Sequence, residues 1–327
     1  MKSIPLTILV FAGYDQCSYT ANYPIAYKEE IVCSVQPLIH LYYQSNSKCF
    51  HYALTTLAYE ALVNHTDIVN LNTRILCWIP TTLKRLDRAL IAYETWAHRC
   101  DHPLFIIAGS PPSSPVNRSV YPFPIAFIAD DSIEKYNQLS EKVLLSLTYI
   151  YKEYHEKYDW FFKGDDDTFV IVENLRYFLR RNPSNVSAYY GYVGRTPDRF
   201  YALGGAGYVL SQEALRRFGK EVLSRPNQRN LCRTDVAEDI NLAACLSRVG
   251  ITVLSLRDQE KLETFHSMTF ESHFVGNSTR WNEGKRKLVI ENGDKCCSPW
   301  SISFHSLSPD QMRMMHFLLY RLQRAPV

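Results

Sequence analysis

The sequence has no long run of one charge and no long apolar segment beyond its first residues. Lysine and arginine number 36 against 33 aspartate and glutamate residues, so the formal net charge is only +3. Without a basic run, this composition gives no sign of nucleic-acid binding. The apolar stretch Ile4–Tyr14 is shorter than the roughly 20 residues of a membrane-spanning helix. It fits a signal-peptide core or a truncated anchor, and no other segment is long and apolar enough to cross a membrane.

Motifs of two other protein classes are also missing. None of the nine cysteines forms a CxxC motif that is followed by a second one, or by HxxxH, at zinc-site spacing. The stretch GGAGYVL is not GxGxxG and does not lead from a strand into a helix, which argues against a dinucleotide site. Its glycines fit either a close approach of the backbone to a ligand or a structural turn.

What the chain does contain indicates a folded protein of the secretory pathway. Apolar residues make up 46% of its 327 residues, enough for one large α/β domain or two smaller ones. The N-x-S/T sequons are more numerous than chance gives, at Asn64, Asn117, Asn185 and Asn277. Together with the cysteines, they point to an oxidising compartment. The odd cysteine count leaves at least one thiol free or paired between chains.

Residues 1–70 have an irregular pattern and are interpreted as an N-terminal anchor or signal followed by a stem. Residues 71–327 are interpreted as the catalytic domain, in which apolar runs typical of strands alternate with helical periodicity. Such alternation predicts a largely parallel sheet with helices on both faces. Strands are expected at 74–79, 104–108, 125–129 and 301–305, and one more just before residue 164. Helices are expected at 83–96, 140–158, 173–180, 235–246 and 309–322. A further helix is expected after Ser211, which would be its N-cap.

Three consecutive acids, Asp165, Asp166 and Asp167, follow an apolar strand. Ligands of open α/β sheets bind at the carboxyl ends of strands, and adjacent carboxylates repel unless a cation neutralises them. Alternate residues of an extended chain share one side, so Asp165 and Asp167 can approach one ion while Asp166 points away. Oxygen ligands suit Mg²⁺ or Mn²⁺, which are often shared with phosphates. The alternative is a solvated acidic turn that caps the next helix.

An acid pair and a histidine are two further candidate site features, and each has a common structural explanation. Glu238 and Asp239 begin a helical run, where acids commonly complement the helix dipole. The alternative is that one of them is a general base, and the residues alone favour this interpretation less. His305 lies at a strand end in SISFHSLSPDQM, and a lone histidine is more often structural. Beside an aspartate-bound ion, however, imidazole is a natural further ligand for Mn²⁺.

A set of blocks resembles one known family. They are RILCW, DWFFKGDDDTFVIVENLRYFL, GGAGYVLSQEALRRF, EDINLAACL and CCSP…SFHSLSPDQM, and they run in family order over about residues 73–325. The chain is similar to the core 1 β1,3-galactosyltransferases of mucin-type O-glycosylation, within the β1,3-glycosyltransferase group that includes the fringe proteins. The resemblance implies a GT-A fold, with a single mixed, mostly parallel sheet flanked by helices.

The resemblance also implies roles for particular residues. Asp165, Asp167 and His305 match the ligands of Mn²⁺ or Mg²⁺, and Asp239, with Glu238 beside it, matches the acid that deprotonates the acceptor. The positions implied to bind the donor are Pro80 and Thr81 in a loop after RILCW, Glu134, Lys135, Tyr136, Asp165, Asp166, Asp167, His305 and Ser306. Those assigned to the acceptor are Trp281, Gly205 and Glu271, and the implied disulfides are Cys77–Cys100 and Cys232–Cys245. Cys296 and Cys297 are left open between a vicinal bridge and other partners.

The implied reaction is inverting transfer of galactose from UDP-galactose to O3 of GalNAc on serine or threonine of a glycoprotein, in the Golgi, by a single-pass type II membrane protein. Whether the chain forms a homodimer stays open. The acceptor side departs from the family: MTFESHF replaces VPEHHL, GRTPDRFYAL replaces a lysine-rich run, and a single tryptophan replaces a WYWNY-like stretch. The alternatives are therefore another UDP-sugar or acceptor, or a non-catalytic chaperone or binding module. The intact DDD motif argues against the last of these.

Overall fold

The computed structural model divides the chain into two compact units, residues 1–58 and 59–327. The described residues are 5–12, 15–22, 32–35, 39–41, 72–128, 138–230, 232, 237–276 and 293–323. The first four of these ranges are described by their backbone alone.

The first unit contains a four-stranded sheet in the order β2-β1-β3-β4. Its strands are β1 (Pro5–Ala12), β2 (Asp15–Asn22), β3 (Val32–Val35) and β4 (Ile39–Leu41). Strand β1 is formed by the β-prone run PLTILVFA, which pairs with β2 along its whole length. The interpretation of residues 1–70 as a stem stays a prediction. No helix among the described residues is long and apolar enough to cross a bilayer. The N-terminal anchor stays a prediction.

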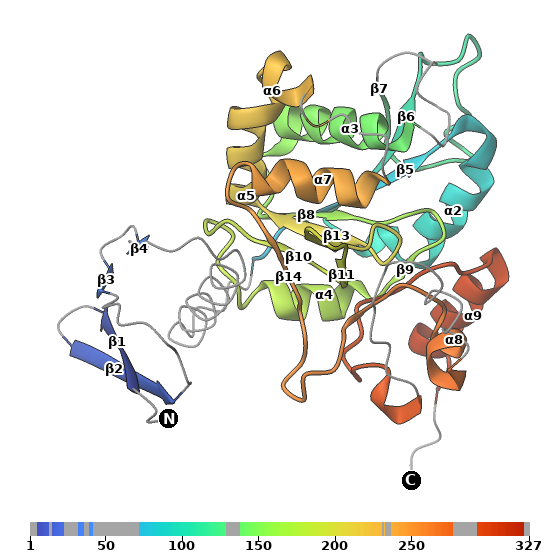
Figure 1. The fold of residues 1–327 in the computed structure, drawn as a ribbon. Coiled ribbons are helices and arrows are strands. Elements are labelled where there is room, and N and C mark those ends of the chain that lie inside the picture. Colours follow the sequence, from blue (N-terminus) through green and yellow to red (C-terminus); the bar gives the residue numbers. More distant parts are fainter. Residues whose placement is uncertain are drawn as a thin grey trace. The chain divides into compact units, whose positions relative to one another are not determined.

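The second unit is built on a seven-stranded sheet in the order β14-β10-β13-β8-β5-β6-β7 (Figure 1). Neighbouring strands are parallel, except that β13 runs antiparallel to both β8 and β10. This confirms the predicted mixed, mostly parallel sheet. The strands are β5 (Ile75–Thr81), β6 (His102–Ala108), β7 (Ile125–Ile128), β8 (Trp160–Lys163), β10 (Tyr189–Gly191), β13 (Tyr208–Ser211) and β14 (Val253–Leu254).

Helices cover both faces of this sheet, with α3, α5 and α7 on one face and α4 and α9 on the other (Figure 1). Ser211 caps α5 as predicted, because its hydroxyl accepts a hydrogen bond from the Ala214 N–H. A capping box of Ser308 and Gln311 begins α9. The helices are α2 (Leu86–Thr95), α3 (Leu139–Tyr154), α4 (Val172–Leu179), α5 (Gln212–Phe218), α6 (Pro226–Asn230), α7 (Glu238–Ser247), α8 (Phe270–Val275) and α9 (Pro309–Tyr320). Shorter helical turns lie at Leu83–Arg85, Ala97–Arg99, Gly219–Leu223 and Gly293–Lys295.

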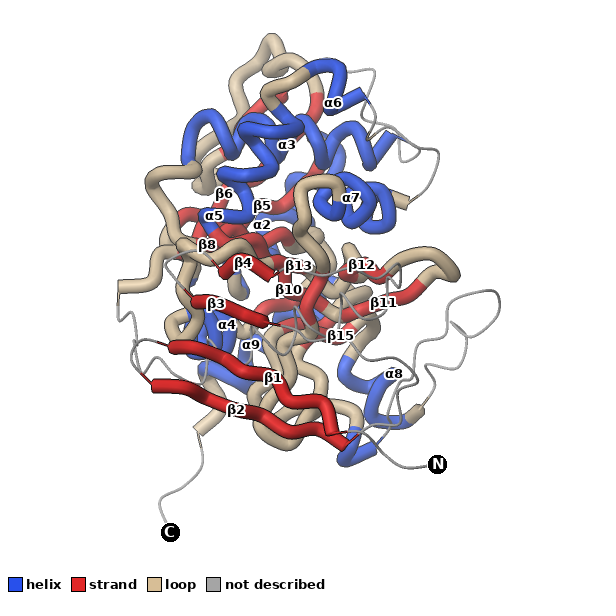
Figure 2. The backbone as a smooth tube through the Cα atoms, turned by 60° about the vertical axis from the view of Figure 1, so that its left-hand side comes forward, coloured by secondary structure: helices blue, strands red, loops and turns tan. Residues whose placement is uncertain are grey.

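Two smaller sheets flank the main one. Strand β16 (Ser303–Phe304) lies between β15 (Phe265–His266) and β9 (Phe169–Val170), and it places Phe304 opposite Phe169. The hairpin of β11 (Val193–Arg195) and β12 (Phe200–Ala202) lies beside α7 (Figure 2). The pairing of β16 with β9 brings the C-terminal part of the chain next to the acidic motif.

The strand order places a ligand site at the ends of β5 and β8. From β5 the chain moves through α2 to β6 and β7, then returns through α3 to β8 on the other side of β5. This reversal is a topological switch point, and ligands of open α/β sheets bind outside the carboxyl ends of the strands there. The acidic motif follows β8 at this point.

Three disulfides lie in the second unit. Cys77 in β5 bonds Cys100, and Cys232 bonds Cys245 in α7, the two pairs that the resemblance implies. Cys296 bonds Cys297, so the pairing that the sequence left open is a vicinal bridge in the structure.

Candidate active site

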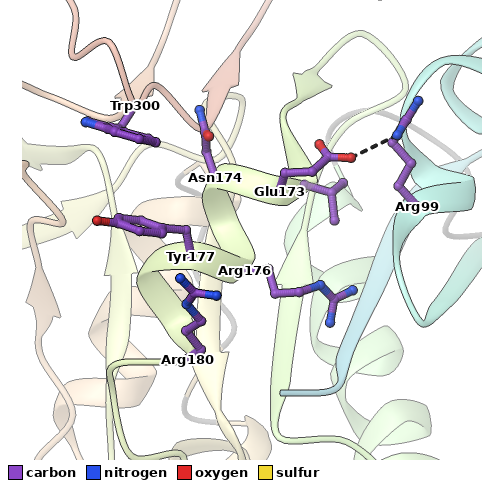
Figure 3. A pocket seen from close by; sticks show the side chains of 8 residues that line it. Arg99, Glu173, Asn174, Arg176, Tyr177, Arg180 and Trp300 are labelled. Carbon is purple, nitrogen blue, oxygen red and sulfur yellow. Dashed lines mark hydrogen bonds and ion pairs between the residues drawn. The ribbon is translucent and has the colours of Figure 1, made fainter. Parts of the chain in front are cut away.

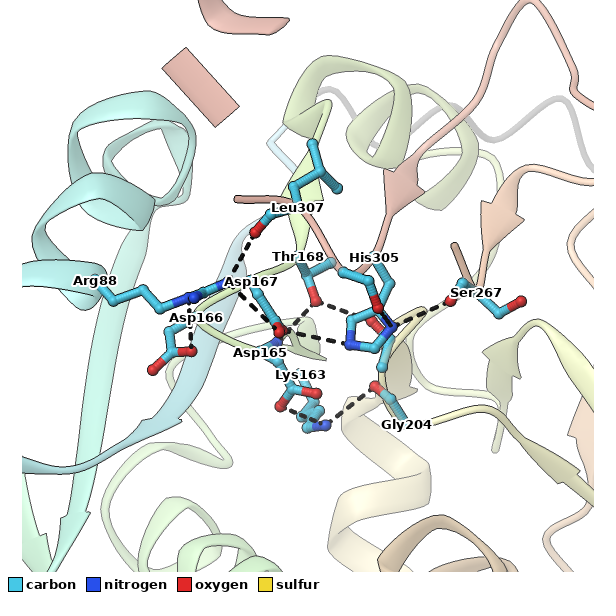
Figure 4. A network of polar contacts seen from close by, with 12 residues as sticks. Arg88, Lys163, Asp165, Asp166, Asp167, Thr168, Gly204, Ser267, His305 and Leu307 are labelled. Atoms are coloured by element: carbon cyan, nitrogen blue, oxygen red, sulfur yellow. Dashed lines mark hydrogen bonds and ion pairs between the residues drawn. The ribbon is translucent and has the colours of Figure 1, made fainter. Parts of the chain in front are cut away.

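Asp165, Asp167 and His305 converge at the carboxyl end of β8. One ligand atom from each lies within 4.8 Å of the others, a spacing that suits a single metal ion. His305 Nε2 is 3.3 Å from the Asp167 carboxylate (Figure 4). The two aspartates come directly from the chain after β8, whereas the histidine comes from the end of β16. Pairing of β16 with β9 therefore builds the cluster.

The histidine is oriented as a metal ligand. Its Nδ1 lies 3.1 Å from the backbone carbonyl of Ser267, and a carbonyl can only accept, so Nδ1 carries the proton. Nε2 is then free to bind a cation, which is the usual arrangement around ligating histidines. The next residue, Ser306, has a φ of 61° and turns the chain after the strand. Two carboxylates and one imidazole therefore fit a divalent ion such as Mn²⁺.

Charge couples these ligands to one another. Burial alone would raise the pKa of Asp167, but the hydrogen bond with His305 and the nearby arginines outweigh it, so the pKa is lowered. Burial alone would lower the pKa of His305, but the contact with Asp167 and the charge of Asp165 outweigh it, so the pKa is raised. Each shift favours the charged form of its group, because the two side chains stabilise each other's charge.

The middle acid of the motif faces the other way. Asp166 is buried and accepts hydrogen bonds from the Thr81 hydroxyl at 3.1 Å and from Arg85 through both Nε and Nη2. Arg88 lies 3.7 Å from Asp166 and 3.7 Å from Asp167, and it donates to the Leu307 carbonyl at 2.8 Å. Asp166 thus attaches the motif to the start of α2 and leaves its two neighbours facing the His305 side.

A fully buried lysine joins the acidic motif to the start of α7. Lys163 Nζ lies 2.8 Å from Asp165, 3.2 Å from Glu238 and 3.0 Å from the Gly204 carbonyl. These contacts occupy the three donors of an ammonium group. Burial alone would lower the pKa of Lys163, but the charges of Asp165 and Glu238 outweigh it, so the pKa is raised. The lysine remains charged and holds both acids in place.

The two acids that begin α7 have different surroundings. Burial raises the pKa of Glu238 to about 7, against the charge of Lys163. One oxygen of Glu238 contacts Lys163, and the other is buried with no hydrogen-bond partner among the described residues. Asp239 accepts from the backbone N–H of Gly204 at 3.1 Å and of Ile240 at 2.8 Å. Both carboxylates are held near the acid cluster.

The glycines of GGAGYVL allow this close packing. A Cβ on Gly205 would lie 2.3 Å from the His305 ring, and one on Gly204 would lie 2.2 Å from the Glu238 carboxylate. No other residue type fits these two positions without moving the His305 ring or the Glu238 carboxylate. The sequence allowed two interpretations of these glycines, a close approach of the backbone or a structural turn, and the structure shows a close approach. The glycines approach side chains of the site itself.

The structure places the remaining predicted residues in several locations. Pro80 and Thr81 were expected in a loop, which was wrong: they are the last residues of β5, because their backbone pairs with Ile106 and Ile107 of β6. Ser306 directly follows the histidine, and Glu271 is exposed on α8. Glu134, Lys135, Tyr136 and Trp281 lie outside the described residues.

Sequence reasoning missed three residues of the site. Lys163 stands two positions before the first acid, and a lysine that ends a buried apolar strand is itself a signal of a paired charge. Arg85 and Arg88 are separated by one helical turn, which places both on one side of the helix start. Nothing in their local pattern distinguishes them from solvent-exposed arginines.

A mixed, mostly parallel α/β sheet with an aspartate cluster at the carboxyl end of a central strand is the architecture of glycosyltransferases of the GT-A class. A fringe-like family profile matches residues 85–317, and the chain belongs to this family. Within the family it falls in the group of the core 1 β1,3-galactosyltransferases, and it is an enzyme.

Individual relatives agree with this assignment. Glycoprotein-N-acetylgalactosamine 3-beta-galactosyltransferase 1 of Xenopus laevis is 33% identical over 263 residues, which cover 76% of this chain and 67% of the relative. Chondroitin sulfate synthase 3 of Homo sapiens is 28% identical over 178 residues, covering 51% of this chain and 19% of that protein. A beta-1,3-glucosyltransferase of Mus musculus is 33% identical over 106 residues, covering 30% and 20% of the two chains.

Proposed function

We propose that the chain transfers galactose from UDP-galactose to O3 of GalNAc linked to serine or threonine of a glycoprotein, with inversion and with Mn²⁺ or Mg²⁺. The observation that carries the proposal is the meeting of Asp165, Asp167 and His305 beside the acids of α7. The name of the Xenopus relative supports the donor and the acceptor. A Golgi location, an N-terminal membrane anchor and a homodimer belong to the same proposal.

Each residue of the candidate site has a separate role in the proposed reaction. Asp165, Asp167 and His305 hold the cation, which supplies positive charge beside the diphosphate leaving group. Asp166, fixed by Thr81 and Arg85, anchors the motif to α2. Asp239 accepts the proton of the acceptor O3 as that oxygen attacks C1 of the sugar from the face opposite UDP. A single displacement of this kind converts an α-linked donor into a β-linked product.

The donor and the metal are tested together. Purified full-length protein is incubated with a panel of radiolabelled UDP-sugars and a GalNAc-peptide, with Mn²⁺ or with EDTA. We expect transfer from UDP-galactose that EDTA abolishes, and loss of metal-dependent UDP binding in Asp167→Ala. The control Asp310→Ala removes an acid of α9 whose side chain is 95% exposed, and it keeps both properties. Turnover with only another UDP-sugar would assign the altered-donor alternative, and absence of UDP binding would contradict the proposed UDP-galactose donor.

The general base is tested by comparing the two acids of α7. Asp239→Asn should lower kcat by roughly 10²–10⁴-fold, the usual contribution of a positioned general base. It should leave the UDP dissociation constant nearly unchanged, because Asp239 does not contact the metal ligands. Glu238→Gln keeps the shape of the side chain and should lower kcat less. If Glu238→Gln is the more damaging variant, the base is Glu238 and not Asp239.

A further inference from the structure

A pocket of about 310 Å³ lies on α4, in a part of the fold that the proposed reaction does not use. Its walls come from three separate segments: Arg99 before β6, residues of α4, and Trp300 before β16 (Figure 3). The Asn174 side chain donates to the Ser301 carbonyl at 2.7 Å and so ties α4 to the segment that carries the tryptophan. The volume is near the lower limit of small-molecule sites.

The pocket contains an exposed aromatic platform. The rings of Tyr177 and Trp300 are nearly parallel, with an interplanar angle of 9° and centroids 5.0 Å apart. At this separation the two rings are offset, so the stack leaves apolar ring surface uncovered. Trp300 is 48% exposed, whereas Trp78, Trp96 and Trp160 are buried in the core. The exposed ring surface of Trp300 beside the pocket is therefore available to stack against a ligand.

Guanidinium groups flank this platform, and two of them have no acidic partner among the described residues. Arg99 pairs with Glu173 at 2.8 Å, so its charge is balanced. Arg180 lies 5.1 Å and Arg181 3.8 Å from the centre of the Tyr177 ring. The Nε of Arg180 is buried without a hydrogen-bond partner in the described part of the chain. The side of the pocket next to Tyr177 therefore carries excess positive charge.

We propose that this pocket binds an acidic sugar, a pyranose that carries a carboxylate or a sulfate, within a longer glycan. The C–H face of a pyranose ring packs on an aromatic side chain. A guanidinium group recognises a carboxylate or a sulfate through paired, charge-assisted hydrogen bonds. A neutral sugar would leave Arg180 unpaired, and a simple inorganic anion would leave the aromatic platform uncovered. An acidic sugar satisfies both features.

The pocket is distinct from the candidate active site. Strands β9 and β16 are antiparallel, with Val170 opposite Ser303. Asp167 precedes β9 and His305 follows β16, so both lie at one end of the strand pair, whereas α4 follows β9 and Trp300 precedes β16 at the other end. A glycan bound here would not occupy the donor site, and the inference does not depend on which sugar the enzyme transfers.

Calorimetric titration of the full-length chain tests the proposal with three hexasaccharides: hyaluronan, which carries carboxylates; chondroitin sulfate, which carries both acidic groups; and neutral maltohexaose. At least one acidic hexasaccharide should bind roughly tenfold or more tightly than maltohexaose, a difference of about 1.4 kcal/mol. Trp300→Ala and Arg180→Gln should each weaken that binding several-fold, while saturating UDP with Mn²⁺ should leave it unchanged. Hyaluronan compared with chondroitin sulfate distinguishes a carboxylate from a sulfate as the recognised group.

Matched variants make the result decisive. Arg313→Gln removes one positive charge from α9, where Arg313 pairs with Asp310, and it should bind as the wild type does. Arg181→Gln, which removes the guanidinium 3.8 Å from the centre of the Tyr177 ring, provides a second variant beside the aromatic platform if Arg180→Gln lowers the melting temperature. The proposal is overturned if Arg313→Gln weakens binding as much as Arg180→Gln, because attraction would then be general. It is also overturned if UDP displaces the glycan, or if maltohexaose binds as tightly as both acidic hexasaccharides.

Discussion

As a metal ligand, His305 would need a different protonation state from the one that the acids favour in the metal-free site. Without a metal ion, Asp165 and Asp167 raise the pKa of His305 above its ordinary value of 6.5 and favour the imidazolium. A bound cation needs the neutral ring, because the lone pair of Nε2 is the ligand. Metal binding must therefore displace a proton, and the carboxylates that attract the metal also hold that proton in place.

This competition predicts the pH dependence of metal binding. Below the raised pKa of His305, Mn²⁺ binding should release about one proton and strengthen with rising pH; above that pKa, release should approach zero. Calorimetry in two buffers with different ionisation enthalpies measures the released protons. His316→Gln, an α9 variant away from the cluster, should leave the release unchanged. Binding at pH 6 without proton release would show that His305 is not a ligand.

The residue scale also shows what sequence alone could and could not find. The adjacent acids were visible as an electrostatic conflict. Asp166 faces away from its neighbours as predicted, but the reason given was wrong: β8 ends at Lys163, and the acids lie in a turn closed by a hydrogen bond from the Thr168 N–H to the Asp165 carbonyl. His305 could not be selected from ten histidines by pattern, and only its place in family order indicated it. The partners of Asp166 could not be predicted, because Arg85 comes from a helix 81 positions earlier in the chain.

At the scale of elements, the site depends on the close approach of the Gly204–Gly205 turn to β16 and α7. Gly205→Ala should lower metal-dependent UDP affinity by roughly tenfold or more, because the added Cβ would meet the His305 ring at 2.3 Å and displace a ligand. UDP titration with Mn²⁺ measures the effect. Gly250→Asn is the control: Gly250 has a φ of +73°, which asparagine tolerates, and the nearest neighbouring atom to an added Cβ is 3.9 Å away. Unchanged UDP affinity in Gly205→Ala would contradict the assigned role of His305.

Elements differ in how far local pattern determines them. Helix α9 was predicted within two residues of its observed bounds, because hydrophobic periodicity and caps are local, whereas α3 begins within one residue of its predicted start but ends at Tyr154 and not at residue 158. The order of the strands in the sheet was not predictable. Alternation of strands and helices along the chain does not determine which edge of the growing sheet each new strand joins. Strands β9 and β16 contain two residues each and pair over a long sequence separation. Their short pairing brings the candidate metal ligands together, and no periodic pattern in the sequence indicates it.

At the scale of the whole molecule, every feature assigned to catalysis lies in one of the two compact units. The family match, the three disulfides and the acid cluster all fall within residues 59–327. This distribution predicts that a chain beginning at Tyr59 folds without the first unit. In an oxidising expression system it should bind UDP with Mn²⁺ within about twofold of the full-length affinity, a difference of about 0.4 kcal/mol.

Thermal unfolding and UDP titration of the two proteins side by side measure this independence. The truncated chain should keep a cooperative transition, because the seven-stranded sheet and the helices on both faces form a core of their own. Asp167→Ala in the truncated chain is the matched control and should abolish the metal-dependent binding there as it does in the full-length protein. Loss of cooperative unfolding on truncation would mean that the first unit contributes to the stability of the second. Loss of UDP binding with unchanged unfolding would mean that it contributes to the donor site.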